Sequence, residues 1–377
     1  MIMILAIISH TQHYKDKNGT IVGWGATVRE LDNLTKVFDK VIHVAPLHND
    51  SVPSGMLSYC SDRVEFVPLF PSGGETFVEK LGIIKTAKHN LSVVAKILAR
   101  ADVFQFRAPT GMGAYMIPYL LTCGKPGWFK YAGNWIQKNP PLGYWIQRAM
   151  LRKMSKHKVT INGHWQDQKP NQLTFENPCL TGDERIEGRN AVKNKDYSGK
   201  LNFIFIGRLE DAKGVQRILN VFTKLSDSRI GQIHFVGDGA SRKDYEEYAK
   251  GHKIDNAVFH GFLTRDEVNE LLKESHVFLL PSSASEGFPK VIAEAANYGV
   301  IPIVSDVSSI GQYIIEDITG FIVKDAEESI LHEKILKVLS SDPLKLSDIA
   351  RYAYEMAQRF TYDHYNHRII SEIIADE

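Results

Sequence analysis

Short apolar runs alternate with amphipathic stretches along most of this chain, and the alternation limits the folds that it can adopt. In the first half, strands are predicted at 2–8, 41–44, 64–67, 103–106 and 158–161, and helices at 77–99 and 144–154. Strands that alternate with helices indicate βαβ units, and therefore a parallel sheet.

The alternation restarts more clearly in the second half. Strands are predicted at 203–206, 233–236, 258–260, 277–280 and 301–304, with helices near 214–225, 241–251, 265–273 and 288–298 and a final helix at 361–375. Between the halves, residues 177–200 combine glycines, a proline and many charges without apolar periodicity, which predicts an interdomain linker. Because 377 residues exceed one ordinary α/β core, we expect two doubly wound α/β domains in tandem.

Composition and the first residues indicate where such a chain works. Three cysteines without metal-ligand or CxxC spacing favour a reducing compartment. The apolar start ends at Ile8, with no basic segment before it and no cleavage site after it, so we interpret it as a strand rather than a signal peptide. No later apolar run approaches the roughly 20 residues that span a bilayer. We therefore expect a cytoplasmic protein.

The net charge of +1 conceals an asymmetry. Residues 1–190 hold 23 Lys and Arg against 15 Asp and Glu, whereas the remaining residues hold 22 against 29. Within the basic half, residues 145–158 combine five cations with Trp145, which predicts peripheral association with an anionic membrane surface. An ordinary packed helix with a solvated basic face is the alternative. No nucleic-acid partner is expected.

The segment 285–294 carries the clearest chemical signal. It reads Ser-Glu-Gly-Phe-Pro-Lys-Val-Ile-Ala-Glu, follows a predicted strand and opens a predicted helix. Gly287 lets the backbone approach a ligand closely, and Pro289 suits the first helical turn. The free N–H groups at such a helix start form an anion site that matches a diphosphate.

Two carboxylates flank this helix start, Glu286 just before it and Glu294 within it. A carboxylate only accepts hydrogen bonds, so hydroxyl groups are its natural partners. A nucleotide-sugar, which has hydroxyls on both sides of a diphosphate, would satisfy both. The alternative is a capped helix with two solvated glutamates.

A second segment, 205–214, reads Phe-Ile-Gly-Arg-Leu-Glu-Asp-Ala-Lys-Gly and follows the first strand of the second half. Arg208 and Lys213 fall in a strand-to-helix loop, where α/β sheets place ligands. Both side chains can neutralise phosphate. Solvated surface cations are the alternative, but flanking glycines favour phosphate binding.

Together the two segments resemble the retaining glycosyltransferases of family four, whose donor-binding half carries a Gly-Arg to Lys-Gly loop and an E-x7-E motif. Here these stand at 207–214 and 286–294. Four lesser marks agree in order, at 236–239, 259–262, 280–282 and 319–321. The resemblance covers about residues 200–360.

This resemblance implies the GT-B fold, with two doubly wound Rossmann-like domains in tandem and a cleft between them. An acceptor-binding domain would span 1–180, a donor-binding domain 181–360, and a final helix at 361–377 would pack back on the first. The implied activity is transfer of a sugar, with retention, from a UDP- or GDP-sugar to a glycan or polyprenyl-linked acceptor. Cell-surface polysaccharide or glycolipid biosynthesis is the implied setting.

The resemblance also assigns roles to residues. Arg208 and Lys213 would bind the donor diphosphate, Glu286 would face the transferred sugar, and these three form the expected catalytic set. Glu294 would hold the ribose hydroxyls. Backbone contacts are expected from Gly287, Phe288, Pro289, Lys290 and Val291 at the helix start, and from Gly261, Phe262 and Leu263 beside the base.

The first half offers weaker candidates. A glycine-containing loop after the first strand is expected near the donor phosphate, and 23–25 with Gly25 is the candidate. Arg107 lies at a predicted strand end, where ligand contacts are common. The histidines considered for catalysis are His10, His13 and His164, with a surface role as the alternative for each.

No Asp-x-Asp and no metal-ligand spacing occurs in the sequence, so we expect neither a metal nor a cofactor beyond the donor. The segment 236–242 lacks the third glycine of a dinucleotide-binding loop and predicts a turn. Alternatives of the same fold are a nucleotide-sugar epimerase or a phosphorylase. A non-catalytic two-lobed binding protein is the alternative from another class.

Overall fold

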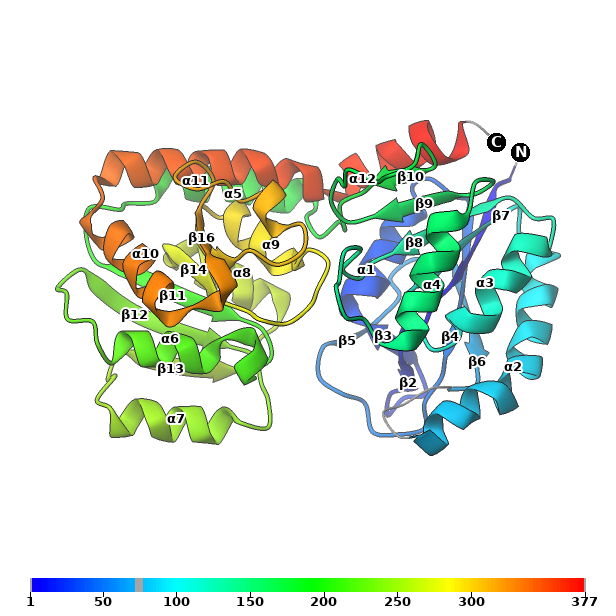
Figure 1. The fold of residues 1–377 in the computed structure, drawn as a ribbon, viewed down its shortest axis with the longest axis horizontal. Coiled ribbons are helices and arrows are strands. Elements are labelled where there is room, and N and C mark those ends of the chain that lie inside the picture. Colours follow the sequence, from blue (N-terminus) through cyan, green and yellow to red (C-terminus); the bar gives the residue numbers. More distant parts are fainter. Residues whose placement is uncertain (1, 72–76, 376–377) are drawn as a thin grey trace. The chain divides into compact units, whose positions relative to one another are not determined.

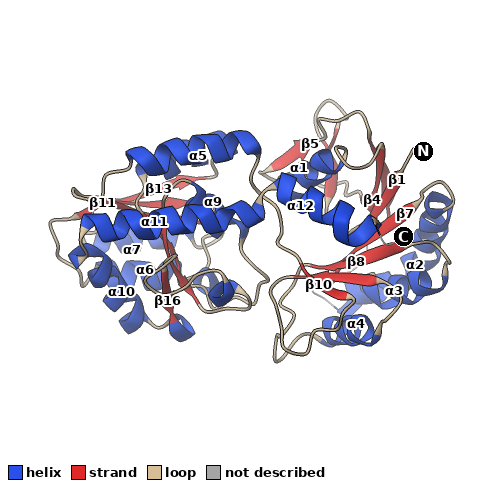
Figure 2. Cartoon of the chain, turned by 90° about the horizontal axis from the view of Figure 1, so that it is seen from above, coloured by secondary structure: helices blue, strands red, loops and turns tan. Residues whose placement is uncertain are grey.

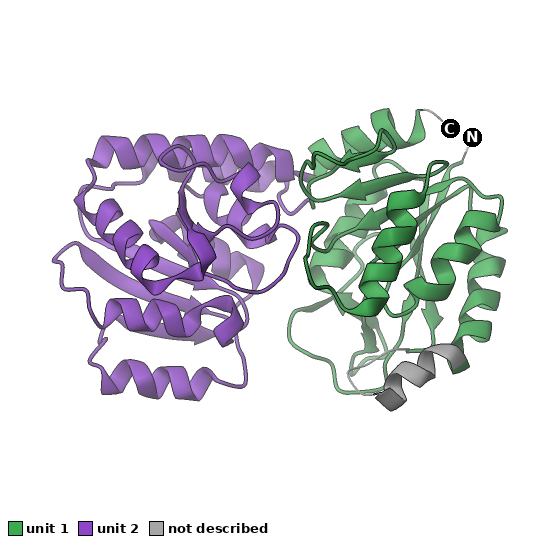
Figure 3. Ribbon diagram, viewed as in Figure 1, with its two compact units in different colours: residues 1–177, 362–377 green, residues 178–361 purple. Residues whose placement is uncertain are grey.

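The computed structural model describes residues 2–71 and 77–375, those of 77–84 by their backbone alone, and it divides into two compact units. Unit 1 comprises residues 1–177 and 362–377, and unit 2 comprises residues 178–361 (Figure 3). The sequence placed the boundaries after 180 and after 360. Residues 376–377 of the expected final helix lie outside the described residues.

Unit 1 is built on a seven-stranded parallel sheet in the order β10-β9-β8-β7-β1-β4-β6 (Figure 1). Its strands are β1 (Ile4–Ile8), β4 (Lys40–Pro46), β6 (Val64–Leu69), β7 (Val103–Ala108), β8 (Gly127–Tyr131), β9 (Lys158–Ile161) and β10 (Gln172–Thr174). Three short strands, β2 (His13–Lys15), β3 (Ile21–Trp24) and β5 (Met56–Ser58), form a separate antiparallel sheet.

Both faces of the unit 1 sheet are buried, as its apolar strands require. Leu5 and Ile7 of β1 join a core with α1 (Gly25–Leu34), α12 (Tyr362–Arg368) and the π-helical segment Ile369–Ile374. Ala6 and Ile8 point to the other face, where the core includes α2 (Phe77–Leu98), α3 (Gly113–Thr122) and α4 (Leu142–Lys153). Because alternate side chains of a strand point to opposite faces, β1 contributes residues to both cores.

Unit 2 holds a six-stranded parallel sheet in the order β13-β12-β11-β14-β15-β16. The strands are β11 (Leu201–Ile206), β12 (Ile230–Val236), β13 (Ala257–Gly261), β14 (Val277–Leu280), β15 (Ile301–Ser305) and β16 (Phe321–Val323). The helices are α5 (Gly182–Asn194), α6 (Val215–Phe222), α7 (Arg242–Gly251), α8 (Arg265–Glu274), α9 (Lys290–Asn297), α10 (Glu328–Ser340) and α11 (Pro343–Ala357). Helices α5, α9 and α11 pack together, and α6 packs against both α7 and α10. Figure 2 shows helices beside the sheet of each unit.

The predicted linker at 177–200 is wrong, because most of it is helix α5. Thr181 and Glu184 form a capping box that starts this helix, a pattern that the sequence contains. The helix lacks apolar periodicity because it buries polar groups instead. Arg185 donates to the Asn297 side chain at 2.8 Å, and a Cβ at Gly188 would lie 2.2 Å from the Asn297 carbonyl oxygen.

The last helix belongs to unit 1. Tyr365, Ile369 and Ile373 are buried in its core, and the Asn366 side chain donates to the carbonyl oxygen of Asn33 at 3.0 Å. Within the described residues, no helix combines the length and the apolar character needed to cross a bilayer.

Candidate active site

The strand order of unit 2 determines which loops can meet. From β11 the chain proceeds to β12 and β13 on one side, and it then returns to β14 on the other, so the order reverses between β11 and β14. The loops 207–214 and 281–289 leave these two neighbouring strands at the same carboxyl edge. Ligands of open α/β sheets bind at such a reversal.

Glycines allow these loops to pack closely. Gly214 has φ +91°, and a Cβ there would lie 2.3 Å from the carbonyl oxygen of Pro281. Gly237 has φ +126°, and a Cβ there would lie 2.0 Å from the carbonyl oxygen of Gly207. The turn at 236–239 therefore packs against the loop that follows β11. Both positions require glycine for steric reasons.

Lys213 and Glu286, one from each loop, form an ion pair between Nζ and Oε1. Their side chains are 18% and 29% exposed. The Ser283 N–H joins the same loops by donating to the Ala212 carbonyl at 2.9 Å. The fold thus brings together the predicted phosphate cation and the predicted sugar carboxylate, which are 73 residues apart.

Arg208 lies in the same loop but outside this pair. Its Nε is 3.2 Å from the Glu210 carboxylate, and its side chain is 74% exposed. Such an exposed ion pair contributes at most about 1 kcal/mol. Arg208 can therefore leave Glu210 for another anion at little cost.

Helix α9 begins directly after the β14 loop. Its N-cap is Pro289, which has no side-chain oxygen to satisfy the first N–H groups of the helix. Phe288 is buried, with its ring 4.4 Å from that of Phe360 and 5.0 Å from that of Tyr313. Phe288 can therefore offer a ligand only its backbone. Gly287 is also buried, and Lys290 and Val291 are half-buried.

Glu294, farther along α9, is held by Arg265 at the start of α8. Nη1 of Arg265 lies 2.7 Å from Oε1 of Glu294, while Nε donates to Glu184 and Nη2 donates to the Cys179 carbonyl. Burial by itself would lower the pKa of Arg265, but the two carboxylates raise it. Glu294 and Glu286 thus have different cationic partners, Arg265 and Lys213.

Sequence reasoning missed Arg265 and Glu184. The three charged residues of this cluster come from α5, α8 and α9, and no motif spacing connects them. The capping box at Thr181 was the one available signal, because it fixes Glu184 at the start of a helix.

The loop after β13 presents mostly backbone. Gly261 has φ +73°, accepts from the Gly237 N–H at 2.8 Å, and would clash with Arg242 if it carried a Cβ. Phe262 is half-exposed, whereas Leu263 packs on the core of unit 2. An aromatic face and backbone groups are therefore what residues 261–263 offer to a ligand.

In unit 1, the glycines of the predicted loop serve close packing. The Gly25 N–H donates to the Gly55 carbonyl at 3.1 Å, and a Cβ at Gly25 would lie 2.9 Å from that oxygen. Gly23 leaves room for the ring of His13, which a Cβ would approach to 2.4 Å. The Gly25 N–H is thus engaged inside unit 1, and its contact with a donor stays a prediction.

Arg107 is buried in an ion cluster. Its Nη2 lies 2.8 Å from Oε1 of Glu30, and Nζ of Lys130 lies 2.6 Å from the same oxygen. Arg107 also donates to the Gln105 side chain at 2.8 Å, and Lys130 to the Tyr365 hydroxyl at 3.3 Å. The cluster ties β7, β8, α1 and α12 together, which gives Arg107 a structural role.

A chain of hydrogen bonds holds the loop after β1. Nδ1 of His13 lies 2.8 Å from the Thr11 carbonyl, which only accepts, so Nδ1 carries the proton and Nε2 accepts from the Tyr59 hydroxyl at 2.7 Å. The Tyr59 oxygen then accepts from Nδ1 of His43 at 2.6 Å. Nε2 of His43 accepts from the Ser9 hydroxyl at 2.7 Å. These donor and acceptor roles are those of neutral rings, in agreement with burial, which lowers the pKa of both histidines.

The other two candidate histidines are both exposed. His10 follows β1 directly, and His164 lies in the loop after β9. No group of three or more His, Cys, Asp or Glu in the described parts of either unit is arranged to hold a metal ion.

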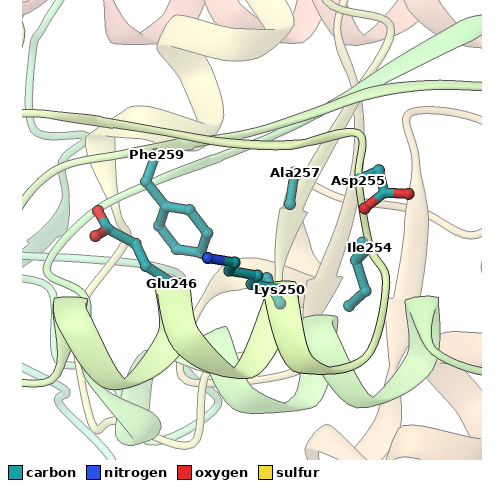
Figure 4. A pocket seen from close by; sticks show the side chains of 7 residues that line it. Glu246, Lys250, Ile254, Asp255, Ala257 and Phe259 are labelled. Carbon is teal, nitrogen blue, oxygen red and sulfur yellow. The ribbon is translucent and has the colours of Figure 1, made fainter.

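An open groove of about 370 Å³ lies between α7 and the edge strand β13 (Figure 4). Its lining comprises Glu246, Ala249, Lys250, Ile254, Asp255, Ala257 and Phe259. It reaches the amino end of β13, whereas the loops described above leave the carboxyl ends of their strands. The groove contains no residue of the two motifs.

The fold is that of the GT-B glycosyltransferases. The HepE protein of Anabaena, solved in complex with UDP, superposes with a TM-score of 0.69 over 100% of both chains at 15% identity. The lipopolysaccharide outer core galactosyltransferase WaaB superposes with a TM-score of 0.68, also over 100% of both chains, at 14% identity.

Residues 188–356 match the family Glycosyl transferases group 1, in agreement with the resemblance carried by the two motifs. An uncharacterized 41.2 kDa protein in the cps region of Klebsiella pneumoniae is 29% identical over 171 residues, which are 45% of each chain. The chain thus spans about half the length of the curated relatives it matches.

The buried histidines predict an acid-sensitive unit 1. Burial lowers the pKa of His13 from 6.5 to about 4, and it lowers the pKa of His43 well below 6.5. The folded state then binds fewer protons than the unfolded state, so stability is complete above pH 6.5 and is lost as the pH falls toward 4. Tryptophan fluorescence during urea unfolding reports unit 1, because all five tryptophans lie there.

We expect the urea midpoint of wild-type protein to fall between pH 7 and pH 5, and to fall less in His13→Gln. His252→Gln, at an exposed position of unit 2, is the control, and its urea midpoint should fall between pH 7 and pH 5 as much as that of wild type. An equally large fall of the midpoint in His13→Gln would contradict the prediction.

Proposed function

We propose that this protein is a retaining glycosyltransferase that takes its sugar from a nucleotide-sugar donor. The observation that carries the proposal is the Lys213–Glu286 ion pair, placed where the strand order reverses and just before α9 begins. A cation suited to phosphate and a carboxylate suited to hydroxyls meet there beside a helix start. A sugar joined to a diphosphate presents both chemistries side by side.

In this proposal the diphosphate lies against the first turn of α9. Arg208, Lys213 and the backbone N–H groups of Gly287, Phe288, Lys290 and Val291 bind its oxygens, because Pro289 has no N–H to donate. Residues 261–263 lie beside the base. Glu294 binds the ribose hydroxyls.

The ion pair also has a role in the chemistry. Departure of the diphosphate leaves positive charge on the sugar carbon and negative charge on the leaving group. Lys213 and the helix start would stabilise the negative charge of the leaving group. Glu286 would face the developing positive charge. Without ligand, each of these side chains neutralises the other. When a phosphate engages Lys213, Glu286 becomes free to face the sugar.

The donor in this proposal is a UDP- or GDP-sugar, and the acceptor is a glycan or a polyprenyl-linked glycan. Support for the donor class comes from the UDP in the HepE structure. The cps-region relative and the lipopolysaccharide galactosyltransferase support a cell-surface polysaccharide or glycolipid as the product. Such work would take place in the cytoplasm, at the inner face of the membrane.

Mass spectrometry of the protein with a panel of UDP- and GDP-sugars tests this proposal. We expect one donor to release its nucleoside diphosphate, equally in EDTA and in Mg²⁺, because Arg208, Lys213 and a helix start already supply positive groups at the diphosphate. Activity that EDTA abolishes and Mn²⁺ or Mg²⁺ restores would contradict the metal-free part. An epimerised donor, which keeps its mass and is therefore detected by NMR of the same mixture, would favour an epimerase. Sugar phosphate formed from a glycan and phosphate would favour a phosphorylase.

The two glutamates should separate in kinetics. Glu294→Ala removes a contact that is the same in ground and transition states, so KM for the donor should rise with little change in kcat. A hydrogen bond to a charged acceptor contributes about 1.5–3 kcal/mol, so the rise should be about ten- to a hundred-fold. Glu286→Gln keeps the shape but loses the charge, so kcat should fall while donor affinity is largely kept.

Initial rates and calorimetric donor titrations of both variants give these values. Arg265 keeps Glu184 as a partner in Glu294→Ala, so this variant leaves no unpaired buried cation. Small and equal effects of the two substitutions would mean that neither glutamate contacts the donor, and would contradict a donor site at the start of α9.

We also propose that unit 1 touches an anionic membrane through the start of α4. Residues 141–146 are exposed, with Leu142 and Trp145 at 72% and 54%. Lys138 and Lys153 are exposed on either side of them. An apolar segment between cations suits an anionic lipid surface.

Only part of the predicted basic segment at 145–158 is exposed in the structure. Arg148 does not face solvent, because it is buried and donates to the Trp135 and Gln137 carbonyls at 3.0 and 2.9 Å. Leu151 is buried as well. The exposed apolar side chains therefore come from the first turns of α4 alone.

Flotation with anionic liposomes at low and high salt tests the membrane contact. Wild-type protein should float at low salt, and Leu142→Asp should float much less because it places a charge in the apolar segment. Leu344→Asp, at a 77%-exposed leucine of unit 2, is the matched control and should float like wild type. Failure of the wild-type protein to float at low salt would contradict the proposal.

A further inference from the structure

Arg265 lies outside both motifs, yet it is bonded to the carboxylate proposed for the ribose. Its three guanidinium nitrogens donate to three acceptors: Glu184 on α5, Glu294 on α9 and the carbonyl of Cys179. The side chain of Arg265 is largely buried, as are those of both glutamates. One side chain thus fixes two helices and the segment that enters unit 2.

The charges in this cluster do not balance, because two carboxylates face one cation. Glu184 is used on both oxygens. Oε1 accepts from Arg265 and, at 3.4 Å, from Asn269, while Oε2 accepts from the Thr181 N–H at 2.8 Å. Glu184 is therefore a fixed anchor that neutralises Arg265.

Glu294 differs from Glu184 in this respect. Its Oε1 accepts from Arg265, and no hydrogen bond to its Oε2 is formed by residues in the described part of the chain. A negative charge and one oxygen therefore stay available on Glu294, although its position is fixed. A carboxylate held on one oxygen and open on the other is arranged to accept from a ligand hydroxyl.

We propose that Arg265 is a positioning residue that sets Glu294 for the ribose of the donor nucleotide, with Glu184 as its anchor. This inference rests on the proposed function and deepens it. Arg265 also follows the loop 261–263 by two residues, so one short segment carries the proposed base contact and holds the proposed ribose contact. Arg265 therefore acts on the nucleoside part of the donor, and the diphosphate contacts at Lys213 do not depend on it.

The geometry requires arginine. A planar guanidinium directs its donors along fixed, divergent lines, whereas a lysine ammonium is a single point at the end of a flexible stem. Arg265→Lys keeps the charge but cannot reach Glu184, Glu294 and the Cys179 carbonyl together. The variant therefore tests position separately from charge.

Calorimetric titration with UDP and with GDP tests the proposal on whichever nucleotide wild-type protein binds, together with its 2′,3′-dideoxy form. Arg265→Lys should bind the complete nucleotide about ten-fold more weakly, as expected for a displaced hydrogen bond to a charged group. It should bind the dideoxy nucleotide as wild type does, because the hydroxyls that Glu294 contacts are missing. Adding Arg265→Lys to Glu294→Gln should cause no further loss.

Arg351→Lys is the matched control. Arg351 lies on α11 in the same unit, pairs with Asp348 and Glu355, and is more exposed than Arg265. Its substitution should leave both affinities unchanged.

The outcomes separate this inference from the proposed function. If wild-type protein binds neither nucleotide, both fail. If Arg265→Lys binds the complete nucleotide as wild type does, or loses the same factor for the dideoxy form, only the positioning role fails. Should Arg265→Lys not fold, Glu184→Gln, which removes the anchor charge, replaces it with the same expected pattern.

Discussion

The reversal of strand order in each sheet is the constraint on which the rest of this molecule depends. In a parallel sheet all carboxyl ends share one edge, and loops part from one another only where the order reverses. Unit 1 reverses between β1 and β7, and unit 2 between β11 and β14. The side chains with the most chemistry follow these strands: Ser9 and His10 after β1, Arg107 at the end of β7, and Lys213 and Glu286 in the loops of unit 2.

The charged side chains at these edges differ between the two units in their exposure to solvent. In unit 1, Arg107 and Lys130 share Glu30 and are almost closed to solvent. Removing Glu30 there would leave two buried cations without their shared carboxylate, which costs about 3–5 kcal/mol. In unit 2, the Lys213–Glu286 pair is partly exposed, and a ligand can replace one partner with a charge of the same sign. The first arrangement suits a scaffold and the second suits an exchangeable site.

Much of the fold could be predicted from local pattern, and the misses have physical causes. Strands such as β1 and β14 are continuous apolar runs, so the sequence identifies them directly. Strand β8 escaped because its sequence, Gly-Trp-Phe-Lys-Tyr, carries Lys130, whose charge is buried against Glu30. Helix α5 escaped because it packs through Glu184, Arg185 and Gly188 rather than through an apolar stripe.

The residues of the candidate site also fall into those that local pattern identifies and those that it does not. Lys213 and Glu286 could be found because each stands at a fixed place in a strand-loop-helix unit, where glycine and proline spacing reveals the backbone. Arg265 could not be found, because its meaning lies in Glu184 and Glu294, which come from other helices. His13 and Arg107 were candidates because the local sequence does not show that they are buried. In the fold, burial and hydrogen-bond partners give both side chains a structural role. Local pattern therefore locates the loop that can hold a ligand, and only the fold shows which charges in it are already satisfied.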